Sequence, residues 1–327
     1  MKHLFSIVTC VFLVSSPSIQ AQESSTRQLA ARTELHPIHT LTLSDEQFLA
    51  GEETGSRPVT VAGRLSIAQG AGRLPVVVLI HGSGGLDARA EVWSNQFHAM
   101  GVSTFLIDGF TGRGLTNVSA DQALLGRLNL ILDAYRALDI LAKHPRVDPS
   151  KIVVMGFSRG GQATLYASVK RFHRLWNRSG AEFAAYVPFY PDCATTYLTD
   201  VDVADRPIRI FHGTADDINP VAPCKAYVER LRGAGQDVQL TEYPNAQHTF
   251  DGLLGSTTPT LNDSQTVRHC TIREEPAGHL INAITKQPFT YKDPCVEQGA
   301  HSGYDPVASR AAQQTVGDFL RVLLKLP

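Results

Sequence analysis

The chain alternates between short apolar segments and longer stretches in which apolar residues recur at helical spacing. A continuous run of apolar, β-branched residues such as Leu74–Ile80 (LPVVVLI) is typical of a strand that is buried on both faces of a parallel sheet. Strands are predicted at 58–67, 74–80, 102–107, 151–155, 184–189, 207–211 and 238–243. Helices are predicted at 91–100, 120–144, 160–171, 223–232 and 307–325. This order predicts an α/β fold, with a mostly parallel central sheet and helices on both faces.

One long segment interrupts this regular order. Residues 252–303 show no clear periodicity and are rich in proline, threonine, glycine and histidine. A segment of this length inside a compact domain is usually functional or disordered, and we therefore predict a flap over the functional site. The chain is then divided into a signal peptide (1–21), an N-terminal extension (22–56) and an α/β domain (57–327) that carries the flap.

The N-terminus has the pattern of an export signal. Lys2 and His3 precede the apolar run Leu4–Val14, which is too short to span a bilayer as a helix, and Ala21 is the expected last residue before cleavage. An uncleaved anchor or a buried helix is the alternative. A lipoprotein would need Cys10 as its lipidated residue, but the apolar run continues past that cysteine. The pattern predicts a periplasmic or secreted protein whose mature chain does not insert into the membrane.

Composition limits the classes of partner. The chain has 30 basic and 31 acidic residues, so its formal net charge is -1, and it carries no basic run. A charge balance of this kind provides no strong field to hold nucleic acid or an anionic membrane. We therefore expect a small-molecule substrate and no nucleic-acid partner.

The strongest chemical motif is Gly156–Gly161 (GFSRGG), which follows a buried strand and precedes a predicted helix. In this context the pattern predicts a nucleophile elbow, a tight turn that exposes the hydroxyl of Ser158. The backbone N–H of Arg159 is expected to face the same site and to bind the oxyanion of an acyl-transfer intermediate. An ordinary glycine-rich turn between a strand and a helix is the alternative.

A serine nucleophile needs a base and an acid to activate it. His248 lies in a polar turn directly after a predicted strand, and we assign it as the base, with His301 as the second candidate because it precedes the last helix. Asp216 and Asp217 both follow the strand at 207–211. We prefer Asp216 as the acid, whereas Asp217 is expected to cap the following turn.

The second oxyanion donor is expected in the loop after the strand at 74–80. The chain there reads His81-Gly82-Ser83-Gly84-Gly85, which is similar to the glycine-rich loops that supply this N–H group in α/β hydrolases. Ser83 or Gly84 is the predicted donor, and His81 is interpreted as a residue that braces the loop. A phosphate-binding loop is disfavoured because no Gly-x-Gly-x-x-Gly pattern is present.

Together these motifs resemble the dienelactone hydrolase family of α/β hydrolases. The resemblance runs from about Pro58 to the end of the chain, excluding most of the flap. It rests on the segments Leu74–Gly85, Leu106–Gly114, Val147–Gly161, His212–Pro220 and Tyr243–Asp251. The resemblance implies a catalytic triad of Ser158, Asp216 and His248.

Two positions in this resemblance bear on the substrate. The founding enzymes of the family carry cysteine where this chain has Ser158, so a dienelactone substrate is in doubt, and members with serine look like general carboxylesterases. Arg113 falls at a position that resembles a substrate-side arginine of the family, where it would hold a substrate carboxylate. A salt-bridged arginine with no substrate contact is the alternative.

Four cysteines remain after removal of the signal peptide, and an even number in an oxidising compartment predicts two disulfides. Three pairings are possible. The fold that the resemblance implies brings the loops of Cys193 and Cys224 close together, while Cys270 and Cys295 both lie in the flap. We therefore predict the pairs Cys193–Cys224 and Cys270–Cys295. A zinc site is disfavoured because no two cysteines are separated by two residues.

These expectations combine into an exported serine hydrolase that cleaves carboxylic ester or lactone bonds through an acyl-enzyme, with no metal or organic cofactor. A peptidase or an acyl transferase on the same fold is one alternative. The other is a non-catalytic binding protein that has kept the fold, which loss of a triad residue would indicate.

Overall fold

The computed structural model describes residues 32–252, 260–261 and 263–326, so the predicted signal peptide lies outside the described residues. Its centre is an eight-stranded sheet with the order β1-β2-β4-β3-β5-β6-β8-β9. The strands are β1 (Arg32–Thr42), β2 (Arg57–Ile67), β3 (Leu74–Ile80), β4 (Ser103–Asp108), β5 (Val147–Phe157), β6 (Ala185–Phe189), β8 (Ile208–Gly213) and β9 (Val238–Tyr243). β1 and β2 are antiparallel to their neighbours, and the strands from β4 to β9 pair in parallel. The expected α/β fold is confirmed.

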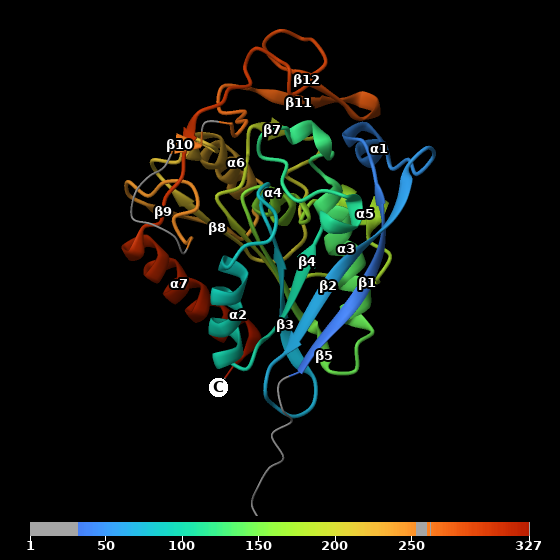
Figure 1. Cartoon of the computed structure of the whole chain (residues 1–327), viewed down its shortest axis with the longest axis vertical. Helices are drawn as coiled ribbons and strands as arrows, with labels where there is room; N and C mark the ends of the chain where they lie inside the picture. The colour runs from blue at the N-terminus through green and yellow to red at the C-terminus, as the bar shows by residue number, and fades with distance from the viewer. Residues whose placement is uncertain (1–31, 253–259, 262, 327) are drawn as a thin grey trace, which may run out of the picture.

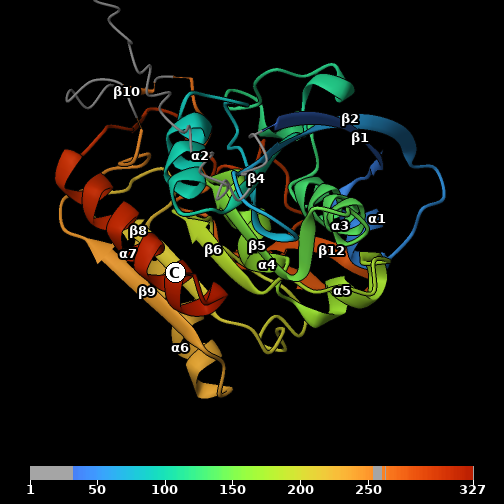
Figure 2. The same cartoon turned by 90° about the horizontal axis from the view of Figure 1, so that it is seen from below.

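Helices cover both faces of this sheet, as Figure 2 shows. The helices are α1 (Asp45–Ala50), α2 (Arg89–Ala99), α3 (Asn129–Ala142), α4 (Arg159–Tyr166), α5 (Lys170–Trp176), α6 (Val221–Gly233) and α7 (Pro306–Leu324). Side chains of β3 alternate between two apolar cores, one shared with α2 and α7 and the other with α3, α4 and α6. Both faces of the strand are therefore buried, which explains its continuous apolar sequence. Within the described ranges, no helix combines the length and apolar character that a membrane crossing requires.

β1 comes from the segment 22–56 that the sequence assigned to an N-terminal extension. It pairs with β2 along its whole length, from Arg32 opposite Ile67 to Thr42 opposite Arg57, and forms the edge of the central sheet. Its sequence carries charged residues and histidines because most of its side chains are exposed or half-buried. An edge strand of this kind has too weak an apolar pattern to be recognised from sequence.

The helix predicted at 120–144 begins only at Asn129. Tertiary hydrogen bonds occupy the polar groups at its start: the side-chain oxygen of Asn129 accepts from the N–H of Leu43, and its amide nitrogen donates to the carbonyl of the same residue. Asp45 likewise accepts from the N–H of Leu128. The residues before Asn129 instead form a loop with one short 3₁₀ turn, Gln122–Leu124. That loop reaches the nucleophile elbow, as described below.

The helix predicted at 160–171 is interrupted after Tyr166, where α4 ends and α5 follows from Lys170. Backbone groups between the two helices pair with another loop, because the N–H of Ala204 donates to the carbonyl of Ser168 and Lys170 donates to the carbonyl of Asp202. These bonds replace the helical pairing that a continuous helix would make.

The flap lies across one end of the central sheet and carries short strands of its own (Figure 1). One small sheet has the order β12-β11-β7, and a separate pair joins β10 to β13. These strands are β7 (Thr195–Thr196), β10 (Thr260–Leu261), β11 (Ile272–Glu275), β12 (His279–Asn282) and β13 (Ala300–His301). β7 belongs to the main domain, so the small sheet fastens the flap to it.

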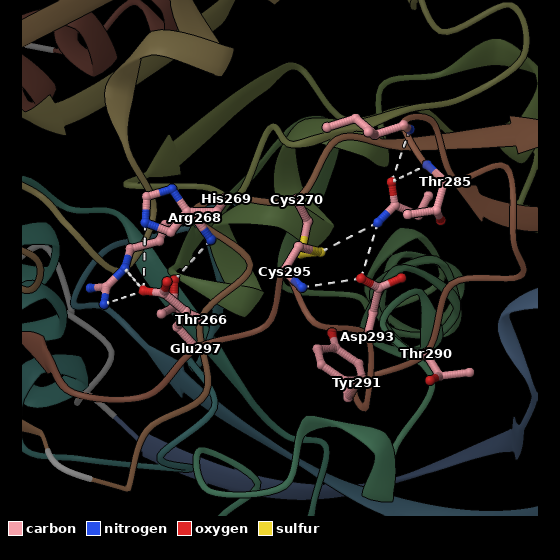
Figure 3. Close-up of a disulfide and its surroundings, with 12 residues drawn as sticks. Thr266, Arg268, His269, Cys270, Thr285, Thr290, Tyr291, Asp293, Cys295 and Glu297 are labelled. Carbon is pink, nitrogen blue, oxygen red and sulfur yellow. Dashed lines mark hydrogen bonds and ion pairs between the residues drawn. A yellow bond between two sulfur atoms is a disulfide. The ribbon is translucent and has the colours of Figure 1, made fainter.

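Both predicted disulfides are formed. Cys193 and Cys224 join the loop after β6 to the first turn of α6, and Cys270 and Cys295 join two segments within the flap. Figure 3 shows the flap disulfide between two groups of polar contacts. On one side Arg268 pairs with Glu297, and on the other Asp293 accepts from the side-chain amide of Asn282.

Replacing Cys270 and Cys295 together by serine is expected to lower the free energy of unfolding by about 3 kcal/mol. The bridge closes a loop of 25 residues, and a cross-link of that span stabilises chiefly by restricting the unfolded chain. Urea unfolding of the double variant and the wild type measures the difference. An unchanged midpoint and slope would contradict a stabilising role for this bridge.

Candidate active site

The turn between β5 and α4 holds Ser158 in a strained conformation, with φ 55° and ψ -114°. Such a backbone is rare for a residue with a side chain and is typical of a nucleophile elbow. The flanking glycines are required by close packing: a Cβ atom on Gly156 would lie 2.1 Å from the carbonyl oxygen of Gly160, and one on Gly160 would lie 2.3 Å from that of Ile80. The sequence therefore forces the serine to the apex of the turn.

The loop after β9 brings His248 to this serine. Its Nε2 lies 2.9 Å from Ser158 Oγ, within hydrogen-bond distance. The ring is almost fully buried and packs edge-on against Tyr190, with 4.7 Å between the ring centroids. A buried imidazole in this position can accept the serine proton.

The loop after β8 places Asp216 on the opposite side of the imidazole. Asp216 Oδ2 lies 2.7 Å from His248 Nδ1, while Oδ1 accepts from the backbone N–H groups of Ile218 and Asn219 at 3.0 and 2.9 Å. Burial by itself raises the pKa of this carboxyl group, but the charge of His248 and hydrogen bonds from His212 and His248 outweigh it and hold the pKa well below its usual range. Asp216 is therefore ionised when it faces His248.

The second candidates, Asp217 and His301, contact each other and not Ser158. Asp217 Oδ2 lies 2.7 Å from His301 Nδ1, and its Oδ1 accepts from the backbone N–H of the same histidine. Arg268 of the flap lies 3.7 Å from the Asp217 carboxylate. The structure thus brings Ser158, His248 and Asp216 together. The expectation that Asp217 caps the following turn is wrong, because Asp216 accepts the N–H groups of that turn and Asp217 bonds to His301 of the flap.

The turn from Gly82 to Gly85 lies directly against the serine. A Cβ atom on Gly82 would be 3.3 Å from Ser158 Cβ. In the part of the chain that the structure describes, the N–H groups of Ser83, Gly84 and Arg159 have no hydrogen-bond partner. They remain available to the oxygen of a bound substrate, which is the requirement for an oxyanion hole.

Two cavities meet at Ser158. One of about 190 Å³ lies over the Gly82–Gly85 turn and His248 and holds Arg89 and Gln265 in its walls. A smaller one of about 50 Å³ lies toward the flap. Its lining is mostly polar and consists of Ser83, Gln122, Arg127, Ser158, Arg159, Gln162, Asp192, Ile218, Asn219, Gln265, Thr266, Val267 and Tyr291. The arrangement leaves room for a small substrate on both sides of the nucleophile.

Flap residues form one wall of the smaller cavity. Thr266 Oγ1 donates to the carbonyl of Ile218 at 2.6 Å, next to the loop that carries Asp216. Tyr291 lies below the flap disulfide in Figure 3. Its hydroxyl accepts a hydrogen bond from Nη2 of Arg127 at 3.0 Å. Described residues of the flap therefore line the smaller cavity beside Ser158.

The prediction that Arg113 binds the substrate is wrong. Its guanidinium is fully buried and forms a bidentate pair with Asp133, at 2.6 and 2.9 Å. The remaining donors reach the carbonyl oxygens of Gly109 and Leu41 and the hydroxyl of Thr42. With every donor direction used inside the protein, Arg113 joins β1 to α3 and cannot reach a ligand at Ser158.

Replacing Arg113 by methionine is expected to lower the free energy of unfolding by about 3–5 kcal/mol, because it leaves the buried Asp133 carboxylate without its partner. The ratio of kcat/KM for a negatively charged ester to that for a neutral ester should not change. Denaturant unfolding and this ratio are the two measurements. A selective fall in kcat/KM for the charged ester would instead support a substrate-binding role for Arg113. Replacing Asp133 by leucine in the same chain should recover part of the stability.

One other group of side chains has the ligand types of a metal site. Among the described residues, Glu34, His36 and His144 place three such atoms within 4.8 Å of one another. However, His144 Nδ1 accepts the backbone N–H of Arg146, so its Nε2 carries the proton and donates to Glu34. A metal on Nε2 would need the opposite tautomer. The group is better explained as a hydrogen-bonded cluster that ties β1 to the end of α3.

Several side chains around the triad carried no sequence signal. Tyr190, which packs on His248, donates its hydroxyl to the buried Asp251 at 2.7 Å and accepts from Arg89. Gln122 and Gln265 reach the site from a loop and from the flap. None belongs to a recognisable motif, because each is placed by tertiary contacts and not by its neighbours in sequence.

Comparisons with known proteins agree with this geometry. The model of the dienelactone hydrolase family matches residues 61–256. Acyl-protein thioesterase 1 of Gibberella zeae is 31% identical over 102 residues, which are 31% of this chain and 42% of that protein. A probable carboxylesterase of Oryza sativa subsp. japonica is 31% identical over 104 residues, covering 32% of this chain and 38% of that protein. The chain thus matches about two fifths of the length of these curated relatives.

A solved structure, the dienelactone hydrolase-like promiscuous phosphotriesterase P91 from metagenomic libraries, has the same fold. It superposes with a TM-score of 0.55 and 18% sequence identity, covering 89% of this chain and 98% of that one. At this identity the likeness concerns the fold alone. The family model, in contrast, spans more than half of the chain and includes the elbow, the acid loop and His248. The chain belongs to the dienelactone hydrolase family.

Proposed function

We propose that this protein is an exported serine hydrolase that cleaves carboxylic ester or lactone bonds through an acyl-enzyme on Ser158. The observation that carries the proposal is the continuous hydrogen-bonded line from Asp216 through His248 to Ser158, with steps of 2.7 and 2.9 Å, at the floor of a cleft. This is the arrangement that makes a serine hydroxyl nucleophilic at neutral pH.

In the first half of the reaction, Ser158 Oγ attacks the carbonyl carbon of the substrate while His248 Nε2 accepts the serine proton. The carbonyl oxygen becomes an oxyanion, which the N–H of Arg159 and that of Ser83 or Gly84 stabilise. The intermediate collapses, His248 returns the proton to the leaving alkoxide, and an ester is left on Ser158. In a lactone the alcohol stays attached to the acyl group.

In the second half, a water molecule takes the place of the alcohol. His248 accepts a proton from this water as its oxygen attacks the acyl carbon, and then gives the proton to Ser158 Oγ as the acid is released. Asp216 keeps the proton of His248 on Nδ1, which leaves Nε2 free to act as the base, and it stabilises the positive imidazolium.

Export rests on two further observations. The N-terminal apolar run has the length and flanks of a cleaved signal, and the chain forms two disulfides, which persist in oxidising compartments. We propose a periplasmic or secreted mature protein from which residues 1–21 are removed. N-terminal sequencing of the protein recovered from the periplasm or medium tests this, and a retained Met1 would contradict it.

Mass spectrometry of the enzyme mixed with a short-chain p-nitrophenyl ester tests the acyl-enzyme directly. A fast burst of p-nitrophenol and an added acyl mass on the peptide that contains Ser158 are expected. Two further reactions distinguish the alternatives. Replacing the ester by a matching thioester tests for thioester cleavage. Adding an alcohol to the ester reaction tests for acyl transfer, because transfer yields a new ester instead of the free acid. Turnover without any acyl mass on Ser158 would refute the proposed mechanism.

A further inference from the structure

The loop between β4 and α3 contacts both sides of the proposed oxyanion hole. Gln122 Oε1 accepts the hydroxyl of Ser83 at 3.0 Å and the guanidinium of Arg159, through Nη1, at 2.6 Å. Ser83 lies in the loop after β3 and Arg159 is the first residue of α4, and their backbone N–H groups are both proposed donors. A single side-chain oxygen therefore ties together the two halves of the hole.

The chemistry of the partners fixes which atom of Gln122 makes these contacts. A guanidinium group has only donors, so the atom beside Arg159 is the amide oxygen and the Ser83 hydroxyl must donate to it as well. The guanidinium has no carboxylate within 4 Å among the described residues, and its other contacts are to the carbonyl oxygens of Gln122 and Leu125. Its position thus depends on neutral acceptors, two of which belong to Gln122.

Further bonds hold this loop in place from two directions. The N–H of Val118 donates to the carbonyl of Ser83 at 2.8 Å, so Ser83 is fixed at both its hydroxyl and its backbone. On the flap side, Gln265 Oε1 accepts from the backbone N–H of Gln122 at 2.8 Å, and the N–H of Gln265 donates to the carbonyl of Ser119 at 2.8 Å. The flap is therefore connected to the oxyanion hole through Gln265 and Gln122.

We infer that Gln122 is a positioning residue that sets the spacing of the two oxyanion donors, and that the flap holds it there through Gln265. The inference rests on the proposed function. Donors of an oxyanion hole act only where they meet the oxygen of the transition state, and small displacements reduce their effect strongly. The His248 ring nitrogens bond to Asp216 and Ser158 and not to Gln122, so we expect the activation of the nucleophile not to depend on Gln122.

Replacing Gln122 by methionine keeps the side-chain length and removes the acceptor. We expect kcat for a p-nitrophenyl ester to fall by about 10–100-fold, somewhat less than the loss of a whole oxyanion donor, with KM nearly unchanged. A trifluoromethyl ketone, whose adduct with Ser158 carries the same oxyanion, should bind more weakly by a similar factor. The pH profile of kcat/KM should keep its shape because the serine and its base are not altered.

The matched control is Gln96→Met. Gln96 donates one hydrogen bond to the carbonyl of Gln313, between α2 and α7 and away from the site, so this variant should lose stability but keep its kcat and its affinity for the ketone. Gln265→Met provides a second test, because it removes the acceptor of the Gln122 backbone N–H but keeps Gln122 Oε1 and the backbone bond from Gln265 to Ser119. It should lower kcat and ketone affinity together, by a smaller factor.

Several results would overturn the inference. They are an unchanged kcat in Gln122→Met, a lower kcat without weaker ketone binding, or a shifted pH profile. If Gln122→Met does not fold, Gln265→Met decides, and unchanged ketone affinity in that variant would refute the connection. Failure of the proposed function looks different, since the wild-type protein would then neither hydrolyse the ester nor bind the ketone.

Discussion

Replacing Ser158 by alanine is expected to lower kcat/KM for a short-chain p-nitrophenyl ester by about 10⁵–10⁶-fold, as in other enzymes that lose the serine of a triad. The hydroxyl lies 2.9 Å from His248 Nε2, within hydrogen-bond distance of the proposed base. A fluorophosphonate probe, which reacts with activated serines, should also stop labelling the protein. Steady-state kinetics and labelling on a gel measure the two effects.

The control for this variant is Ser150→Ala. Ser150 lies near the start of β5, the same strand that leads into the elbow, but it is exposed, and its hydroxyl donates to Asp148. Its replacement should leave labelling and turnover at the wild-type level. If Ser158→Ala were still labelled, or kept its esterase activity, another residue would be the nucleophile.

Replacing Asp216 by asparagine is expected to lower kcat by about 10⁴-fold, because a neutral amide no longer fixes the proton of the histidine on Nδ1. The carboxylate accepts from His248 and from two backbone N–H groups, and its pKa is held well below the ordinary range for aspartate. The Asp216 carboxylate therefore stays ionised at mildly acidic pH, so a loss of wild-type activity at such a pH would be caused by protonation of another group. Kinetics of this variant across the pH range should show no pH at which activity recovers.

The neighbouring substitution, Asp217→Asn, separates the two aspartates. Asp217 faces His301 and Arg268, and it holds the flap without contacting the imidazole of His248. We expect this variant to retain most of its kcat and to change KM more than kcat, through a looser flap. If Asp217→Asn lost as much kcat as Asp216→Asn, the assignment of the acid would have to be revised.

Much of this molecule could be predicted from local sequence, because the physical demands are local. The run Leu74–Ile80 is apolar throughout since both of its faces are buried, and Gly156 and Gly160 are required by backbone contacts within one turn. The same holds for the polar turn that carries His248. The order of these segments along the chain was sufficient to predict the fold class, the elbow and the residues that the structure brings to it.

Contacts between segments that are distant along the chain could not be predicted from local sequence. Asn129 begins α3 because it bonds to Leu43, 86 residues away, and Arg113 is buried because Asp133 and β1 surround it. No periodicity along the chain contains these partners. The exposed edge strand β1 was not predicted for the same reason, since its place in the sheet depends on pairing with β2.

The active site likewise combines features that the sequence predicted with features that only the tertiary structure decided. From the sequence by itself came the elbow serine, the histidine after β9 and the pair of adjacent aspartates. Only the tertiary structure decided that Asp216 faces the imidazole while Asp217 turns to the flap, since neighbouring residues in a turn point in different directions. It alone placed Gln122 between two loops, because hydrogen bonds join groups by their position in space and leave no pattern along the chain.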